Sequence, residues 1–181
     1  VLGSRAYNPQ QVAPICERLA PHNALATEIA YTAGLRAHEL LTLQPRSERT
    51  PDPRPALPTK FEGREDGSRY VVTGKGGLIR EVQLPSHLAA RLEAQRLATP
   101  RPVTDRHVYY QQHYAIGGGQ PWSMAVSRAA KAALGWSTGA HGLRHAYAQE
   151  RVTELQTLEH SQKVANETVS QELGHFRPEI T

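Results

Sequence analysis

The sequence predicts an α+β fold that is mostly helical, with a small antiparallel β-sheet inserted after the first helices. Three observations predict it. Apolar residues recur at helical spacings near both ends of the chain. Two β-favouring runs flank a glycine-rich turn between them. The composition, 39% hydrophobic and 21% charged over 181 residues, is that of a soluble globular protein with a single core.

The first helical region covers residues 8–33. Val12, Ile15, Leu25 and Ile29 recur at helical spacing, and a break near Pro21 divides the region into two helices. The apolar pattern continues through LRAHELLTLQ. If this part is helical, Arg36 and Glu39 share one face because they are three residues apart.

A proline-rich segment, 45–66, follows. Its five prolines stand among charges, and such a stretch neither continues a helix nor pairs as a central strand. We expect an extended loop or insertion here. Two interpretations stay open: a solvated surface loop, or an arm that contacts DNA or another partner through Arg46, Arg49, Arg54 and Lys60.

The β-favouring runs are 70–73 and 78–84, and they predict a hairpin with Lys75 among the glycines of its tip. Ser86 is then expected to cap a helix with Leu88, Leu92 and Leu97 on one side. A loop rich in glycine and proline comes next. Three further helices are expected. The first covers 122–134, the second lies in the stretch HGLRHAYAQERVTEL, and the third covers 163–173 and is ended by a glycine.

Charge and composition narrow the function classes. A net charge of +4 permits an anionic partner such as nucleic acid. No apolar run is long enough to span a membrane, and no secretory signal is present, so we expect a cytoplasmic protein without membrane association. The single cysteine, Cys16, is expected to be a small buried hydrophobe.

A metal site is not expected. His141 and His145 are four residues apart and could share a helix face as a metal clip. Arg144 would lie on the same face and repel a cation, and no cysteine pair accompanies the histidines. We therefore expect neither a metal nor another cofactor.

Four fragments carry chemistry when taken in order: TAGLRAHELLTL, TGKGGLIREVQLP, HGLRHAYA and ELGHF. Together they resemble the catalytic domain of the tyrosine recombinases, the phage-type integrases. The resemblance covers 32–175, which is most of the chain. It rests on a GLR-x-x-EL signature, a glycine-flanked lysine between two strands, an H-x-L-R-H signature and a terminal LGH.

The resemblance implies a set of site residues. The catalytic residues by position are Arg36, Lys75, His141, Arg144 and His175. Glu39 and His145 match supporting positions of the family. Glu39 could orient the guanidinium of Arg36 as a neighbouring carboxylate.

These residue types suit attack on a DNA phosphodiester. Arg36 and Arg144 could hold the non-bridging oxygens, on which negative charge gathers in the transition state. Lys75 on a mobile tip could protonate the leaving 5′ oxygen. His141 could accept the proton of the attacking phenol, and His175 could hold a phosphate oxygen. The implied intermediate is a 3′-phosphotyrosyl link, which needs neither ATP nor metal.

The family's nucleophilic tyrosine follows the LGH motif by roughly two helical turns. The chain here reads LGHFRPEIT and ends at Thr181, so we expect the tyrosine just after Thr181 and interpret 1–181 as a catalytic domain truncated before it. Tyr147 is expected in the core. Tyr109, Tyr110 and Tyr114 match no nucleophile position.

The resemblance further implies double-stranded DNA as partner, a tetramer on paired sites when full length, and a bacterial, nucleoid-associated location. The implied activity is site-specific recombination, for integration or excision of a mobile element. Two alternatives remain: a catalytically inactive DNA-binding relative, and a type IB topoisomerase, which resembles the same catalytic set.

Overall fold

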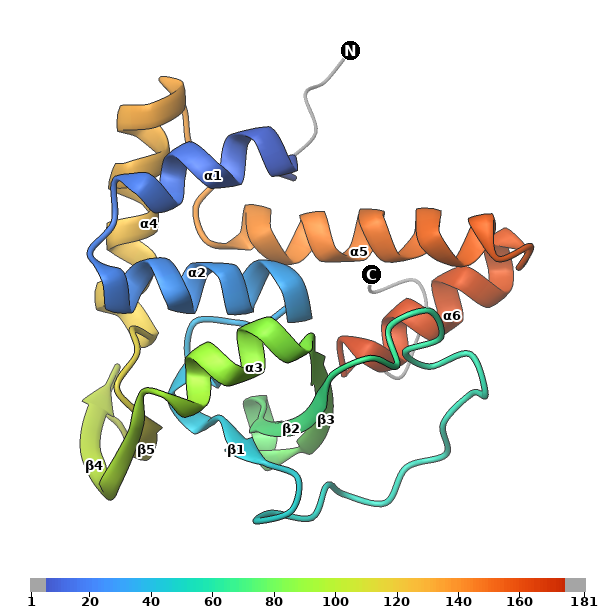
Figure 1. Ribbon diagram of the computed structural model, residues 1–181, viewed down its shortest axis with the longest axis horizontal. Helices are drawn as coiled ribbons and strands as arrows, with labels where there is room; N and C mark the ends of the chain where they lie inside the picture. Colours follow the sequence, from blue (N-terminus) through green and yellow to red (C-terminus); the bar gives the residue numbers. More distant parts are fainter. Residues whose placement is uncertain (1–5, 175–181) are drawn as a thin grey trace.

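The α+β prediction is confirmed by a computed structural model of the chain, which describes residues 6–174 (Figure 1). In chain order the elements are α1 (Pro9–Glu17), α2 (Pro21–Ala33), the 3-10 helix η1 (Glu39–Thr42), β1 (Gln44–Pro45), β2 (Ser68–Thr73), the 3-10 turn η2 (Lys75–Gly77), β3 (Ile79–Leu84), α3 (Ser86–Glu93), β4 (Arg96–Asp105), β5 (Val108–Tyr114), α4 (Gly119–Leu134), α5 (His141–Thr157) and α6 (Gln162–Glu172). Among residues 6–174, no helix is long and apolar enough to cross a membrane.

The two N-terminal helices form as predicted, with capping that the sequence encodes. Asn8 and Gln11 exchange side-chain to backbone hydrogen bonds of 2.9 Å, which cap α1. Pro21 is the first residue of α2, where its missing N–H costs nothing. Helix α2 ends at Ala33, and its C-cap is Gly34, whose φ of 72° is left-handed. A Cβ added at Gly34 would lie 2.7 Å from the Leu173 side chain.

The helix does not continue through Arg36, so the condition on which a shared helix face was expected is not met. The chain turns after Gly34 and re-forms only the short η1 from Glu39. The three-residue spacing still matters, because the backbone N–H of Arg36 donates to Glu39 Oε1 at 2.8 Å. The two residues are therefore linked by a hydrogen bond from the main chain of Arg36 to the side chain of Glu39.

The predicted hairpin is confirmed as β2 and β3, which pair antiparallel from Ser68↔Leu84 to Thr73↔Ile79. The short strand β1 joins the edge of this sheet, where Pro45 is tolerated. A second antiparallel sheet, β4–β5, was not predicted. Helix α3 stops at Glu93, so Leu97 lies in β4 and not on the helix; Pro85, one residue before Ser86, is the N-cap.

The proline-rich segment is irregular, as predicted, but its 57–64 part is not a solvated loop. Leu57 N–H donates to Gln171 at 2.8 Å, Phe61 N–H donates to Glu172 at 2.7 Å, and Arg64 forms an ion pair with Glu154. Phe61 is buried. This part of the segment therefore packs on α5 and α6, while Arg54 is exposed.

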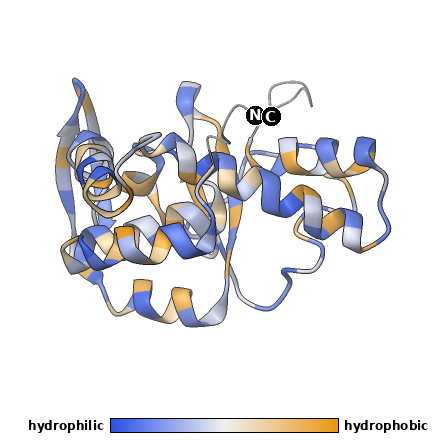
Figure 2. Ribbon diagram, turned by 90° about the horizontal axis from the view of Figure 1, so that it is seen from above, coloured by the Kyte–Doolittle hydropathy of each residue, from blue (hydrophilic) through white to orange (hydrophobic). Residues whose placement is uncertain are grey.

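Two clusters of buried apolar residues make up the core. The larger one contains residues of α1, α2, α3, α4 and the three-stranded sheet, among them Ile15, Ile29, Leu84 and Trp122. The smaller one joins α5 and α6. Figure 2 shows hydrophobic and hydrophilic residues alternating around the helices, as expected when each helix buries one face.

Candidate active site

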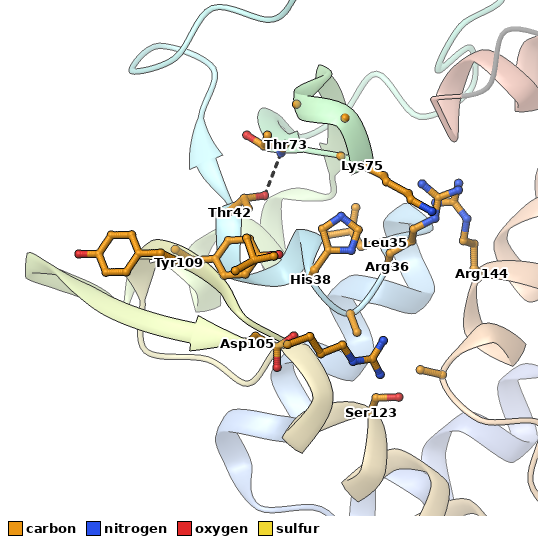
Figure 3. Close-up of a pocket in the computed structure, with 18 of the residues that line it drawn as sticks. Leu35, Arg36, His38, Thr42, Thr73, Lys75, Asp105, Tyr109, Ser123 and Arg144 are labelled. Atoms are coloured by element: carbon orange, nitrogen blue, oxygen red, sulfur yellow. Dashed lines mark hydrogen bonds between the residues drawn. The ribbon is translucent and has the colours of Figure 1, made fainter.

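Four of the sequence-predicted site residues line one pocket of about 1290 Å³: Arg36, Lys75, His141 and Arg144. They reach it from three places: the turn after α2, the tip of the β2–β3 hairpin, and the first turn of α5. The β4–β5 hairpin lines the pocket as well. Figure 3 shows Arg36, Lys75 and Arg144 gathered in the same region of it. The fifth predicted residue, His175, lies outside the described residues.

The pocket lining is strongly cationic. Its charged residues are Arg36, Arg49, Lys75, Arg106, Arg144 and, as the one carboxylate among the described lining residues, Asp105. Asp105 Oδ1 accepts the backbone N–H of Gln120 at 2.8 Å, in the first turn of α4. An excess of positive charge in a concave site attracts an anion and raises its local concentration.

Arg144 is fixed in place by main-chain carbonyls. It is 7% exposed, its Nη1 donates to Gly34 O at 2.6 Å, and its Nη2 donates to Leu173 O at 2.8 Å. Burial, and then the charge of Arg80, lower the pKa of Arg144 to about 9. That value remains above neutral pH, so the guanidinium stays charged. Its orientation is set before any ligand arrives.

Glu39 supplies a negative charge to a cluster of two buried arginines, Arg80 and Arg144. It is fully buried, forms an ion pair with Arg80, and lies 3.9 Å from Arg144 Nη1. Burial opposes its ionisation, but the charges of Arg80 and Arg144 outweigh burial, and the pKa of Glu39 lies below its ordinary value. The carboxylate was expected to orient the Arg36 guanidinium. Its hydrogen bond to Arg36 is instead to the backbone, and its side-chain ion pairs are with Arg80 and Arg144.

Arg80 was missed by sequence reasoning. It is 6% exposed on β3, its Nε donates to Glu172 O at 3.3 Å, and its Nη2 has no hydrogen-bond partner among the residues that the structure describes. A signal was present. Arg80, Val82 and Leu84 alternate along the strand and so share one face, and a charged residue on a buried face requires a charged partner.

Lys75 and His141 are the exposed members of the group. Lys75 stands at the β2–β3 tip beside Gly76 and Gly77, both at positive φ, with nothing within 4 Å of a Cβ built on either glycine. His141 is the first residue of α5, and its ring lies 6.2 Å from that of His145. Among the described residues, no three His, Cys, Asp or Glu side chains are placed to hold a metal ion.

Neither Tyr147 nor Tyr109 presents its hydroxyl to Arg36 or Arg144. Tyr147 is buried, its O–H donates to Glu172 Oε1 at 2.6 Å, and burial raises its pKa well above the ordinary value. This confirms the prediction that Tyr147 belongs to the core. Tyr109 is 62% exposed and lines the pocket, but Figure 3 shows its phenol end pointing away from Arg36 and Arg144.

No protein-family model matches the chain, and no curated protein does. The chain is similar to two solved structures of the XerH site-specific recombinase. One is bound to difH substrate in a pre-cleavage complex, with a TM-score of 0.56 and 18% identity over 99% of this chain and 50% of that one. The other is bound to palindromic difH substrate in a post-cleavage complex, with a TM-score of 0.57 and 18% identity over 97% and 47%.

The chain thus spans about half the length of these structures. At this identity the similarity concerns the arrangement of helices and strands. The chain has the fold of a tyrosine recombinase catalytic domain, as the sequence resemblance implied.

Proposed function

We propose that the chain is the catalytic domain of a site-specific DNA recombinase, which cleaves and rejoins DNA through a 3′-phosphotyrosyl intermediate. One observation carries the proposal: Arg36, Lys75, His141 and Arg144, which come from three segments distant in sequence, line the same cationic pocket. The similarity to XerH, captured with its difH substrate before and after cleavage, supports it.

The arginines bind the phosphate in this proposal. Arg144 is anchored by two carbonyls and Arg36 lies in the same pocket, so their guanidiniums meet the non-bridging oxygens of one phosphodiester. These oxygens gain negative charge as the fifth bond to phosphorus forms. Cations fixed in advance stabilise that charge without reorganising during the reaction.

Protons move through the exposed residues. A tyrosine oxygen attacks phosphorus, and its proton passes to His141. The bond from phosphorus to the 5′ oxygen breaks, and Lys75 protonates that oxygen to give a free 5′ hydroxyl. The tyrosine is the one expected after Thr181, and His175 is expected to hold a phosphate oxygen. Religation reverses each step, so no cofactor is required.

The finer assignments follow the family resemblance. We propose double-stranded DNA as substrate, a tetramer on paired sites in the full-length protein, and integration or excision of a mobile element as the purpose. The proposed location is the bacterial cytoplasm, in association with the nucleoid.

Covalent trapping on a nicked recombination-site duplex tests the activity, using protein that extends past Thr181 and contains the expected tyrosine. Arg36→Ala and Arg144→Ala should each reduce the yield of the protein–DNA adduct by about 10²-fold or more. Lys75→Ala should slow cleavage by a similar factor, and a more acidic 5′ leaving group should restore it. Lys131→Ala, an exposed change on α4, is the control.

Other outcomes would separate the alternatives. DNA binding without any adduct, with the tyrosine present, would reject the enzyme and identify a binding relative. Relaxation of supercoiled DNA without site preference would identify a type IB topoisomerase.

A further inference from the structure

The β4–β5 hairpin forms a wall of the pocket that the proposed chemistry does not use. It is a two-stranded sheet of its own. Its residues in the pocket lining are Asp105, Arg106, Val108, Tyr109, Tyr110, Gln111 and His113. Figure 3 shows Tyr109 and Lys75 on either side of His38, so the two hairpins approach the pocket from different sides.

The tip of this hairpin is held in a strained conformation. Asp105 pairs with Val108, and the two residues between them, Arg106 and His107, have φ of 49° and 69°. Turns of this kind favour Asn and Gly, because other residues pay a steric cost at positive φ. Such strain persists only where the surroundings enforce it and is concentrated at functional sites.

The tip is also held against the first turn of α4. Asp105 is 9% exposed and accepts the N–H of Gln120. A Cβ at Gly119 would lie 2.6 Å from Asp105 Oδ1, so the helix start fits closely around the carboxylate. The hairpin is therefore a fixed projection, and the side chains next to its tip are presented in a set direction.

What the hairpin presents is apolar and cationic. Val108 is 50% exposed and Tyr109 62% exposed, two large hydrophobic side chains adjacent in sequence. Arg101 and Arg106 are exposed on the same hairpin, whereas its one carboxylate, Asp105, is buried. An exposed aromatic group next to cations, continuous with a cationic pocket, complements a nucleic-acid backbone and the sugars and bases beside it.

We propose that the β4–β5 hairpin is a second DNA-contacting element, which holds the duplex beside the reacting phosphate. Tyr109 and Val108 pack against a sugar or base edge, and Arg106 contacts a phosphate. The proposal rests on the proposed function, since it assigns the same DNA to the pocket. It explains why a strained turn and an exposed aromatic residue stand at the pocket rim.

Equilibrium binding of the full-length protein to duplex DNA over a series of salt concentrations tests this. Arg106→Asn removes the charge and keeps a residue that tolerates positive φ, so the fold should be retained. It should reduce the slope of log affinity against log salt by about 1. Tyr109→Ala should weaken binding about tenfold at every salt concentration and leave the slope unchanged.

Matched controls lie on α4, outside the pocket lining. Met124→Ala removes another exposed hydrophobic group, 44% exposed, and Lys131→Asn removes another exposed cation. Circular dichroism of each variant verifies folding. If Tyr109→Ala and Arg106→Asn bind DNA like these controls, while Arg36→Ala and Arg144→Ala lose binding or cleavage, the hairpin proposal is wrong and the proposed function stands.

Two other results are informative. If the arginine variants also bind and cleave like the unaltered protein, the proposed function itself fails. If the hairpin variants keep their DNA affinity but change the oligomeric state in sedimentation, the surface binds a second copy of the chain, which overturns the DNA assignment.

Discussion

The site has a buried side and an exposed side, which are built by opposite means. On the buried side, Arg144 and the residues behind it, Arg80 and Glu39, are almost fully buried and joined by ion pairs and main-chain carbonyls. On the exposed side, Lys75 stands at a hairpin tip, and nothing lies within 4 Å of a Cβ built on the neighbouring Gly76 or Gly77. Groups that must stabilise charge benefit from being fixed in advance, whereas a proton donor must reach an atom that moves. The contrast therefore fits the roles proposed for the two sides.

The buried side extends into the C-terminal helices. Arg151 and Glu172 form an ion pair with both side chains fully buried, and Glu172 also accepts from Tyr147. The carbonyls of Glu172 and Leu173, at the end of α6, accept from Arg80 and Arg144. The end of α6 and the arginine cluster are thus parts of one network, and their positions depend on each other.

The largest effect on stability is expected from Arg151→Met. This change leaves the buried Glu172 carboxylate without its cation, and removing one partner of a buried ion pair costs about 3–5 kcal/mol. The free energy of unfolding in urea measures it. Arg91→Met is the control, because its pair with Glu28 is largely exposed and should contribute less than about 1 kcal/mol. Equal losses for both variants would contradict the assignment of the buried network.

A smaller loss is expected from Glu39→Gln. The amide keeps the shape and can still accept from the Arg36 backbone, but it leaves Arg80 and Arg144 without a balancing charge. We expect about 2–3 kcal/mol less stability, together with weaker cleavage by the full-length protein because Arg144 is less well held. A variant as stable as the unaltered chain would show that the carboxylate does not organise the cluster.

Stability should also fall with acid in two steps. Burial lowers the pKa of His38 and of His113, so the unfolded chain binds protons more readily than the folded one below about pH 6.5, and stability declines there. The lowered pKa of Glu39 and of Glu154 adds a second decline below about pH 4.5, as each folded carboxylate is protonated. His38→Gln should flatten the first step in urea unfolding measured from pH 7 to 5. An unchanged slope in that variant would show that His38 is not its source.

Much of the fold and of the candidate site was predictable, because it depends on residues that are close together in the sequence. The helices and the β2–β3 hairpin follow from apolar spacing and glycines, and ordered motifs identified Arg36, Lys75, His141 and Arg144, which share a pocket. Their catalytic roles stay a prediction.

The features that were missed depend on tertiary contacts or on exceptions to local rules. Pro100 and Pro102 read as a loop, yet a two-stranded sheet tolerates them because each strand has an open edge. Arg80 pairs with Glu39 and Arg151 pairs with the buried Glu172, and both carboxylates lie on other elements, so nothing near either arginine in the sequence identifies these two partners. Likewise, the docking of 57–64 depends on acceptors from α5 and α6.

The smallest stability effect is expected from Lys75→Ala, and this small effect is informative. Lys75 is exposed at a tip between glycines, so its loss should change the free energy of unfolding by no more than about 0.5 kcal/mol. If the two sides of the pocket differ as proposed, the same variant should nevertheless slow DNA cleavage by about 10²-fold. Urea unfolding and adduct trapping on one preparation measure both quantities. A variant that loses stability and activity together would place Lys75 in the structural network and remove the distinction between the two sides.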